Sequence, residues 1–156
     1  APYTNFLAFA EQSFFDELAS ELNVDTIQLR LDLLQNVKNT TDKKIEYSGQ
    51  RMEDTIKLVR DKANWGNTEK GVFQGFSAYY SHNTHVAEIA DIVIEDGFPI
   101  IKKVEVHFIE NNLSPTGLGE PGLPPAGGAV ANAIHAALGK RMYSQPFVKE
   151  LEKETE

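Results

Sequence analysis

The residues of this sequence best suited to chemistry lie in a glycine- and proline-rich stretch, Gly-Leu-Gly-Glu-Pro-Gly-Leu-Pro-Pro, at positions 117–125. Within it Glu120 stands between Gly119 and Pro121. Glycine lets another molecule approach the backbone closely, and proline restricts the direction in which the neighbouring carboxylate points. This pattern is typical of a positioned general base. The alternative is a rigid surface loop whose glutamate faces water, and residue types alone favour it because most exposed glutamates have no special role.

Other chemistries have weaker support in the sequence. Gly-Leu-Gly-Glu-Pro-Gly partly fits the glycine fingerprint of dinucleotide sites, but the stretch is rich in proline and the predicted helix begins several residues too late. His82 and His85 have a His-x-x-His spacing without a second ligand pair, so we predict no metal site. The serines lack the Gly-x-Ser-x-Gly pattern of a hydrolase.

Composition excludes several further classes. The chain of 156 residues has no cysteine, which rules out disulfides, thiol nucleophiles and iron–sulfur ligation by its own residues. Its formal net charge of −8 disfavours non-specific nucleic-acid binding. No apolar run approaches the ~20 residues that span a bilayer. We therefore expect a soluble protein, although the sequence does not distinguish a cytoplasmic from a periplasmic location.

The elements that must position Glu120 follow from periodicity and capping signals. Asp25 with Gln28 forms a capping-box pattern, Ser48 is a second N-cap, and Asp96-Gly97 is a hairpin turn signal. Residues 111–125 are too rich in glycine and proline for regular structure. We predict helices at 4–22, 25–37, 48–66 and 129–138, and strands at 72–80, 86–94 and 98–109. This order predicts one α+β domain over residues 1–156, with an antiparallel or mixed sheet packed against about four helices.

Several of these stretches resemble one enzyme family. The quoted motifs are residues 117–125, Ala-Val-Ala-Asn-Ala-Ile at 129–134, Leu-Gly-Lys-Arg at 138–141 and Gln-Pro-Phe at 145–147. Together they resemble the C-terminal signature of the molybdopterin-binding subunit of molybdenum hydroxylases, and most closely the isoquinoline 1-oxidoreductase beta subunit of the xanthine dehydrogenase and aldehyde oxidase superfamily. Residues 9–19 and 80–90 are similar to further family segments in the same order.

The resemblance implies a reaction and roles for two residues. In the family a glutamate at this motif takes a proton from a molybdenum-bound hydroxyl, the oxygen attacks an electron-poor carbon of an aldehyde or N-heterocycle, and hydride passes to a sulfido ligand. Glu120 matches that catalytic glutamate, and Gly119 would permit close approach of the cofactor. The implied cofactor is molybdopterin in its cytosine dinucleotide form. The implied partners are the rest of the large subunit, an iron–sulfur subunit or domain, and a small-molecule substrate.

The sequence also departs from the family pattern. The first half of the usual subunit and the pocket-lining turn before the first helix are missing, and the family's longer insertion is absent near residues 101–104. The resemblance therefore implies a C-terminal fragment with an internal deletion, which alone binds no molybdenum and is inactive. Two alternatives remain open: a stand-alone small-molecule or anion-binding module that uses the 117–125 loop, and a non-enzymatic assembly domain whose 129–138 helix docks on a partner.

Overall fold

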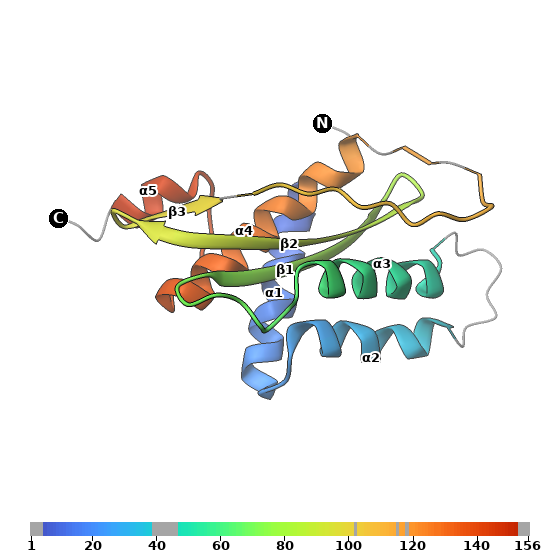
Figure 1. Cartoon of the computed structure of the whole chain (residues 1–156), viewed down its shortest axis with the longest axis horizontal. Helices are drawn as coiled ribbons and strands as arrows, with labels where there is room; N and C mark the ends of the chain where they lie inside the picture. Colours follow the sequence, from blue (N-terminus) through green and yellow to red (C-terminus); the bar gives the residue numbers. More distant parts are fainter. Residues whose placement is uncertain (1–4, 39–46, 102, 115, 118, 153–156) are drawn as a thin grey trace.

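The computed structural model describes residues 5–38, 47–101, 103–114, 116–117 and 119–152. In these residues the chain forms one α+β domain with five α-helices, a short 3₁₀ helix and a three-stranded antiparallel sheet, which confirms the predicted fold class (Figure 1). The elements are α1 Asn5–Leu22, α2 Thr26–Lys38, α3 Gly49–Lys62, β1 Phe73–Ser81, β2 Thr84–Glu95, β3 Phe98–Ile101, η1 Glu120–Gly122, α4 Leu123–Leu138 and α5 Phe147–Glu152.

The predicted N-cap residues cap their helices, although the Gln28 side chain donates to Asp32 Oδ1 and does not complete a capping box with Asp25. The backbone N–H of Gln28 donates to Asp25 Oδ1 at 2.8 Å, and the N–H of Arg51 donates to Ser48 Oγ at 3.3 Å. Each bond satisfies a helical N–H that has no partner inside its own helix. The predicted cap at Thr4 lies outside the described residues.

The sheet is built from two consecutive hairpins in the order β1-β2-β3. Asp96 and Gly97 form the second turn with φ values of 51° and 83°, as their sequence signal predicts. The first turn is made by His82 and Asn83, whose φ values of 51° and 60° also lie in the left-handed region. His82 therefore has a backbone role, in a turn that the sequence analysis did not identify.

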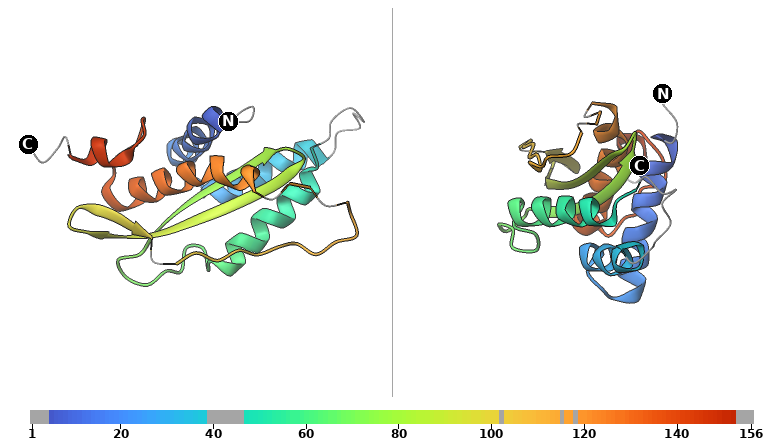
Figure 2. Two further views of the ribbon diagram at one scale, coloured as in Figure 1. Left: turned by 90° about the horizontal axis from the view of Figure 1, so that it is seen from above. Right: turned by 90° about the vertical axis from the view of Figure 1, so that its right-hand side faces the viewer.

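Helices cover both faces of the β1–β2 hairpin, with α4 on one face and α2 and α3 on the other (Figures 1 and 2). Successive strand residues point to opposite faces, and this alternation divides the core into two clusters. One cluster contains Ile27, Leu31, Leu34, Met52, Ile56, Phe76 and Ala78. The other contains Ala90, Ile92, Ala129, Ala131, Ala133, Ile134 and Met142. Helix α1 packs against α4 and reaches the edge of β1.

Side chains bond to the outer edge of β1, where a fourth strand would otherwise pair. Asn132 Nδ2 donates to the Phe76 carbonyl at 2.9 Å, and the N–H of Ala78 donates to Gln12 Oε1 at 2.8 Å. Arg30 Nη2 donates to the Ala78 carbonyl at 2.8 Å. These three bonds satisfy edge groups that would otherwise be buried without a partner.

Residues of the 138–147 motifs serve packing in this fold. Arg141 Nη1 lies 2.5 Å from Asp16 Oδ2, and its Nη2 donates to Ser20 Oγ at 3.1 Å. The ring of Phe147 lies 5.6 Å from that of Phe9. The segment after α4 therefore fastens α1 against the rest of the domain.

Three expected boundaries were wrong. The helix predicted to reach residue 66 ends at Lys62, and residues 63–66 form a turn. The predicted 98–109 strand ends at Ile101, and the described residues 103–110 form no regular element. The loop predicted over 111–125 ends early, because η1 begins at Glu120 and α4 begins at Leu123 instead of residue 129. Prolines 124 and 125 occupy the first turn of α4, where backbone N–H groups have no helical partner and proline costs little.

Candidate functional site

Glu120 is the first residue of η1, and its side chain is exposed. Gly119 precedes it with φ −81° and ψ −82°, and a Cβ added there would meet no atom within 4 Å. The turn therefore presents both an open stretch of backbone and a carboxylate on the outside of the fold. Leu118 of the predicted motif lies outside the described residues.

The backbone on both sides of Glu120 is anchored. Before it, the hydroxyl of the buried Thr84 is hydrogen-bonded to the Gly117 carbonyl at 2.6 Å and lies 2.8 Å from Thr116 Oγ1. After it, Pro121 is buried and leads directly into α4. The structure thus holds the turn against the end of the β1–β2 hairpin while leaving the Glu120 side chain exposed.

The surroundings of Glu120 limit what this chain can do with it alone. No described contact involves its carboxylate, and the two described pockets are lined by other residues. The described residues also contain no group of three His, Asp or Glu side chains that could hold a metal ion. A general base works best where water is excluded. The described part of the chain does not by itself enclose the Glu120 carboxylate.

The His-x-x-His pair does not converge on one point. His82 lies in the first hairpin turn, whereas His85 belongs to β2 and its Nε2 accepts a hydrogen bond from the Ser48 N–H at 3.1 Å. Burial, with a smaller contribution from the charge of Arg51, lowers the pKa of His85 to about 4. His85 is a neutral, structural histidine at neutral pH.

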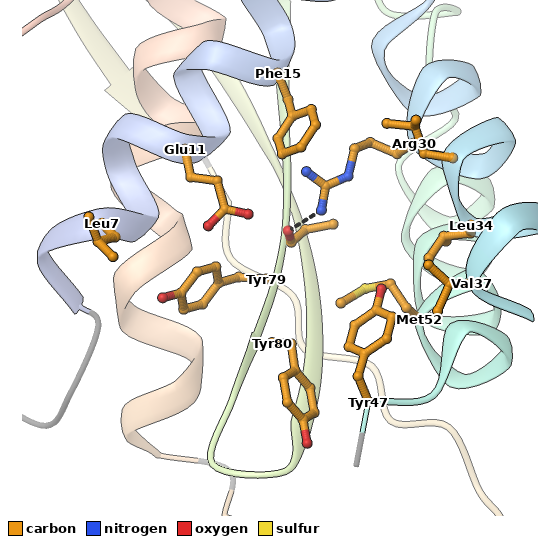
Figure 3. Close-up of a pocket in the computed structure, with 12 residues that line it drawn as sticks. Leu7, Glu11, Phe15, Arg30, Leu34, Val37, Tyr47, Met52, Tyr79 and Tyr80 are labelled. Carbon is orange, nitrogen blue, oxygen red and sulfur yellow. Dashed lines mark hydrogen bonds between the residues drawn. The ribbon is translucent and has the colours of Figure 1, made fainter. Parts of the chain in front are cut away.

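The structure reveals a pocket of about 420 Å³ between α1, α2 and β1, which sequence reasoning missed. Its polar side chains include Glu11, Arg30 and Tyr47 (Figure 3). The one signal in the sequence is Arg30 itself, a cation between Leu29 and Leu31 in a leucine-rich helix. A second pocket, of about 350 Å³, includes Asp16, Asp25, Trp65 and His135.

A buried polar pair lies beneath α4. Ser77 and Glu88 are opposite each other on β1 and β2. Ser77 Oγ and Glu88 Oε2 are both buried without a described hydrogen-bond partner. Burial raises the pKa of Glu88 to about 7. Glu88 is therefore partly protonated near neutral pH.

No model of a known protein family matches this sequence, and no curated protein is similar to it. None of the helices in the described ranges is both long enough and apolar enough to cross a lipid bilayer.

Proposed function

We propose that this chain supplies Glu120 as the general base of a molybdenum hydroxylase site that further polypeptide completes. The observation that carries the proposal is the Gly119–Glu120 turn, whose backbone is anchored by Thr84 and Pro121 but whose carboxylate is exposed. A base that acts on a cofactor held elsewhere needs this combination of fixed position and open approach.

The residues present fit one side of the implied cofactor site. Gly119 would let the cofactor approach the backbone, because no atom lies within 4 Å of a Cβ built at this position. When bound, molybdopterin supplies the metal centre that oxidises the substrate carbon. Glu120 would accept a proton at a carboxylate oxygen as a water-derived oxygen attacks that carbon. A second polypeptide surface would have to exclude water around Glu120.

Exposed apolar residues give this proposal a second line of support. Val104, Val106 and Phe108 are 83%, 68% and 64% exposed, although their alternation is typical of a half-buried strand. Leu123, three residues after Glu120, is 76% exposed. Further polypeptide could cover these side chains and close the site in the same step.

The two alternatives have less support. Neither described pocket touches the 117–125 loop, so a self-contained binding module has no cavity there. The 129–138 helix is the centre of the domain, with Ala129, Ala133 and Ile134 buried against its own sheet. Its most apolar side is therefore not available to a partner.

The test uses the assembly that contains this chain, purified from its natural source. Glu120→Gln should lower turnover by roughly 10²- to 10⁴-fold, the usual contribution of a general base, while molybdenum and pterin content stay unchanged. Glu110→Gln removes another exposed carboxylate and should leave turnover unchanged. Full turnover by the Glu120 variant, or a native assembly without molybdenum and pterin, would refute the proposal.

A further inference from the structure

The pocket between α1, α2 and β1 has the size and lining of a small-molecule site. Its volume of about 420 Å³ lies within the roughly 300–1,000 Å³ range of ligand pockets. Figure 3 shows side chains from three helices and β1 around one space. Leu7, Phe15, Leu34, Val37 and Met52 form its apolar wall.

Arg30 brings a charged group with unused hydrogen-bonding capacity to this pocket. Its Nη2 donates to the Ala78 carbonyl at 2.8 Å, and its Cζ lies 4.1 Å from the centre of the Phe15 ring. Its Nη1 is buried and has no described hydrogen-bond partner. A buried charged donor without a partner is costly, and the cost disappears when an anion accepts from it.

A purely structural role explains only part of this arrangement. The bond to Ala78 caps the edge of β1, but it uses one of the five donors of the guanidinium. The other backbone group of Ala78, its N–H, is satisfied by a neutral amide, because it donates to Gln12 Oε1. A neutral side chain could therefore cap the edge of β1 without an arginine. The arginine is also costly at this position, because burial destabilises its charged form and lowers its pKa.

Two other polar groups set the character of the pocket. The phenol of Tyr47 lines it, and burial raises the pKa of Tyr47, so its hydroxyl stays protonated and can donate. Glu11 is exposed, and its carboxylate points towards the pocket from α1 (Figure 3). The described ion pairs include none between Glu11 and Arg30. The negative charge of Glu11 partly offsets the lowering of the Arg30 pKa, so the two groups interact electrostatically. Arg30 Nη1 still has no described hydrogen-bond partner and can donate to a ligand.

We propose that this pocket binds a small carboxylic acid with an aromatic or aliphatic body, whose carboxylate accepts from Arg30 Nη1 and whose body packs against Phe15, Leu34 and Met52. The carboxylate can belong to a plain acid or to an amino acid. These sources differ at Glu11, because an ammonium group is attracted to that residue and a plain acid is not. The site is separate from Glu120.

The first test measures the affinity of the whole chain for three probes of similar shape, each titrated in a calorimeter. These are 3-phenylpropanoate, its neutral amide 3-phenylpropanamide, and phenylalanine. One of the two acids should bind at least about tenfold more tightly than the amide, since hydrogen bonds to charged groups contribute roughly 1.5–3 kcal/mol. Equal binding of acids and amide, or no binding of either acid at about 10 mM, overturns the proposal.

Variants then locate the carboxylate. Arg30→Gln should lower the affinity for the tighter-binding acid at least about tenfold. Arg60→Gln, the same change at an arginine outside the pocket, should leave that affinity unchanged. If Arg30→Gln fails to fold, Glu11→Gln still decides, because this exposed residue has no described role in packing. Glu11→Gln should tighten binding of phenylpropanoate and weaken that of phenylalanine, each by roughly two- to fivefold. Unchanged affinity for both acids would place the carboxylate elsewhere.

Discussion

At the residue scale, the structure separates charged groups held by partners from those that lack them. Arg141 is paired with Asp16 and Ser20, and it fastens the C-terminal segment to α1. Arg30 Nη1 and Glu88 Oε2 are buried and have no described hydrogen-bond partner. Buried polar groups are satisfied in most native structures. The exceptions are therefore where chemistry, binding or pH sensitivity should be sought.

Glu88 should make the stability of the domain depend on pH. Its pKa is about 7 in the folded chain because burial disfavours the charged form, whereas an unfolded chain has the ordinary value of 4.5. Between these values the folded state holds more protons than the unfolded state, so the free energy of unfolding falls as pH rises from 4.5 through 7. Above that range the loss is complete and amounts to at most roughly 3 kcal/mol.

The measurement is urea unfolding of the wild type and Glu88→Gln at several pH values. Near pH 4.5 the two proteins should have similar stability, because glutamine resembles the protonated acid. As pH rises, the Glu88→Gln variant should become progressively more stable than the wild type. Glu21→Gln, an exposed change in α1, should show no such divergence. Parallel pH curves for wild type and Glu88→Gln would contradict this assignment.

At the element scale, the close crossing of α4 over β1 organises the domain. Gly75 lies under the helix, and a Cβ at this position would be 2.1 Å from the Ala133 nitrogen and 2.2 Å from the Ala129 carbonyl oxygen. Both obstacles are backbone atoms of a buried helix, so the helix would have to move away from the sheet. The small residues Gly75 on β1 and Ala129 and Ala133 on α4 thus together allow the helix to lie this close to the strand.

Gly75→Ala should therefore destabilise the domain by roughly 3 kcal/mol or more, since overpacking against backbone has no easy relief. Alanine is otherwise the better residue in a strand, so propensity alone predicts the opposite sign. Gly122→Ala is the matched control, because a Cβ there meets no atom within 4 Å. Thermal unfolding should show a melting temperature lower by several degrees for Gly75→Ala only. A Gly75→Ala protein as stable as the wild type would mean that α4 does not cross the strand so closely.

The elements that could be predicted from the sequence are those specified by local signals. Asp25 with Gln28, Ser48 and Asp96-Gly97 each act on residues within four positions of themselves. The strand expected to reach Ile109 failed because pairing depends on a distant partner: β3 pairs only with Ile92 to Glu95 of β2, and residues 103–110 do not continue along the rest of β2, which runs back to Thr84. The early start of α4 does not follow from residue types, because prolines break a helix in its interior but are tolerated in its first turn.

The candidate site shows the same division between local and long-range information. Glu120 was predicted as a site residue from its immediate neighbours, Gly119 and Pro121. The pocket at Arg30 was not, because Leu7, Arg30, Tyr47 and Tyr79 are far apart in the sequence and meet only after α1, α2 and β1 pack. A lone arginine among leucines indicates burial, but it does not reveal which cavity it will face.

At the scale of the whole molecule, both candidate sites lie at one end of the β1–β2 hairpin. Thr84 at the start of β2 holds the loop before Glu120, and Ala78 to Tyr80 at the end of β1 line the pocket of Arg30. The two sites use different helices, with α4 behind one and α1 and α2 around the other. They can therefore be tested independently.

The exposed apolar residues Val104, Val106 and Phe108 should make the isolated chain self-associate. They alternate along an extended segment that forms no regular element, and such segments pair with other chains. Replacing all three with serine should give a monomer, while the free energy of unfolding changes by no more than about 0.5 kcal/mol because these side chains are already exposed. Tyr143→Ser, which removes a side chain that is 75% exposed elsewhere, should leave association unchanged. Light scattering over a range of concentrations measures the difference. A wild type that stays monomeric at high concentration would show that the segment has no tendency to pair, and it would remove the second support for a site completed by further polypeptide.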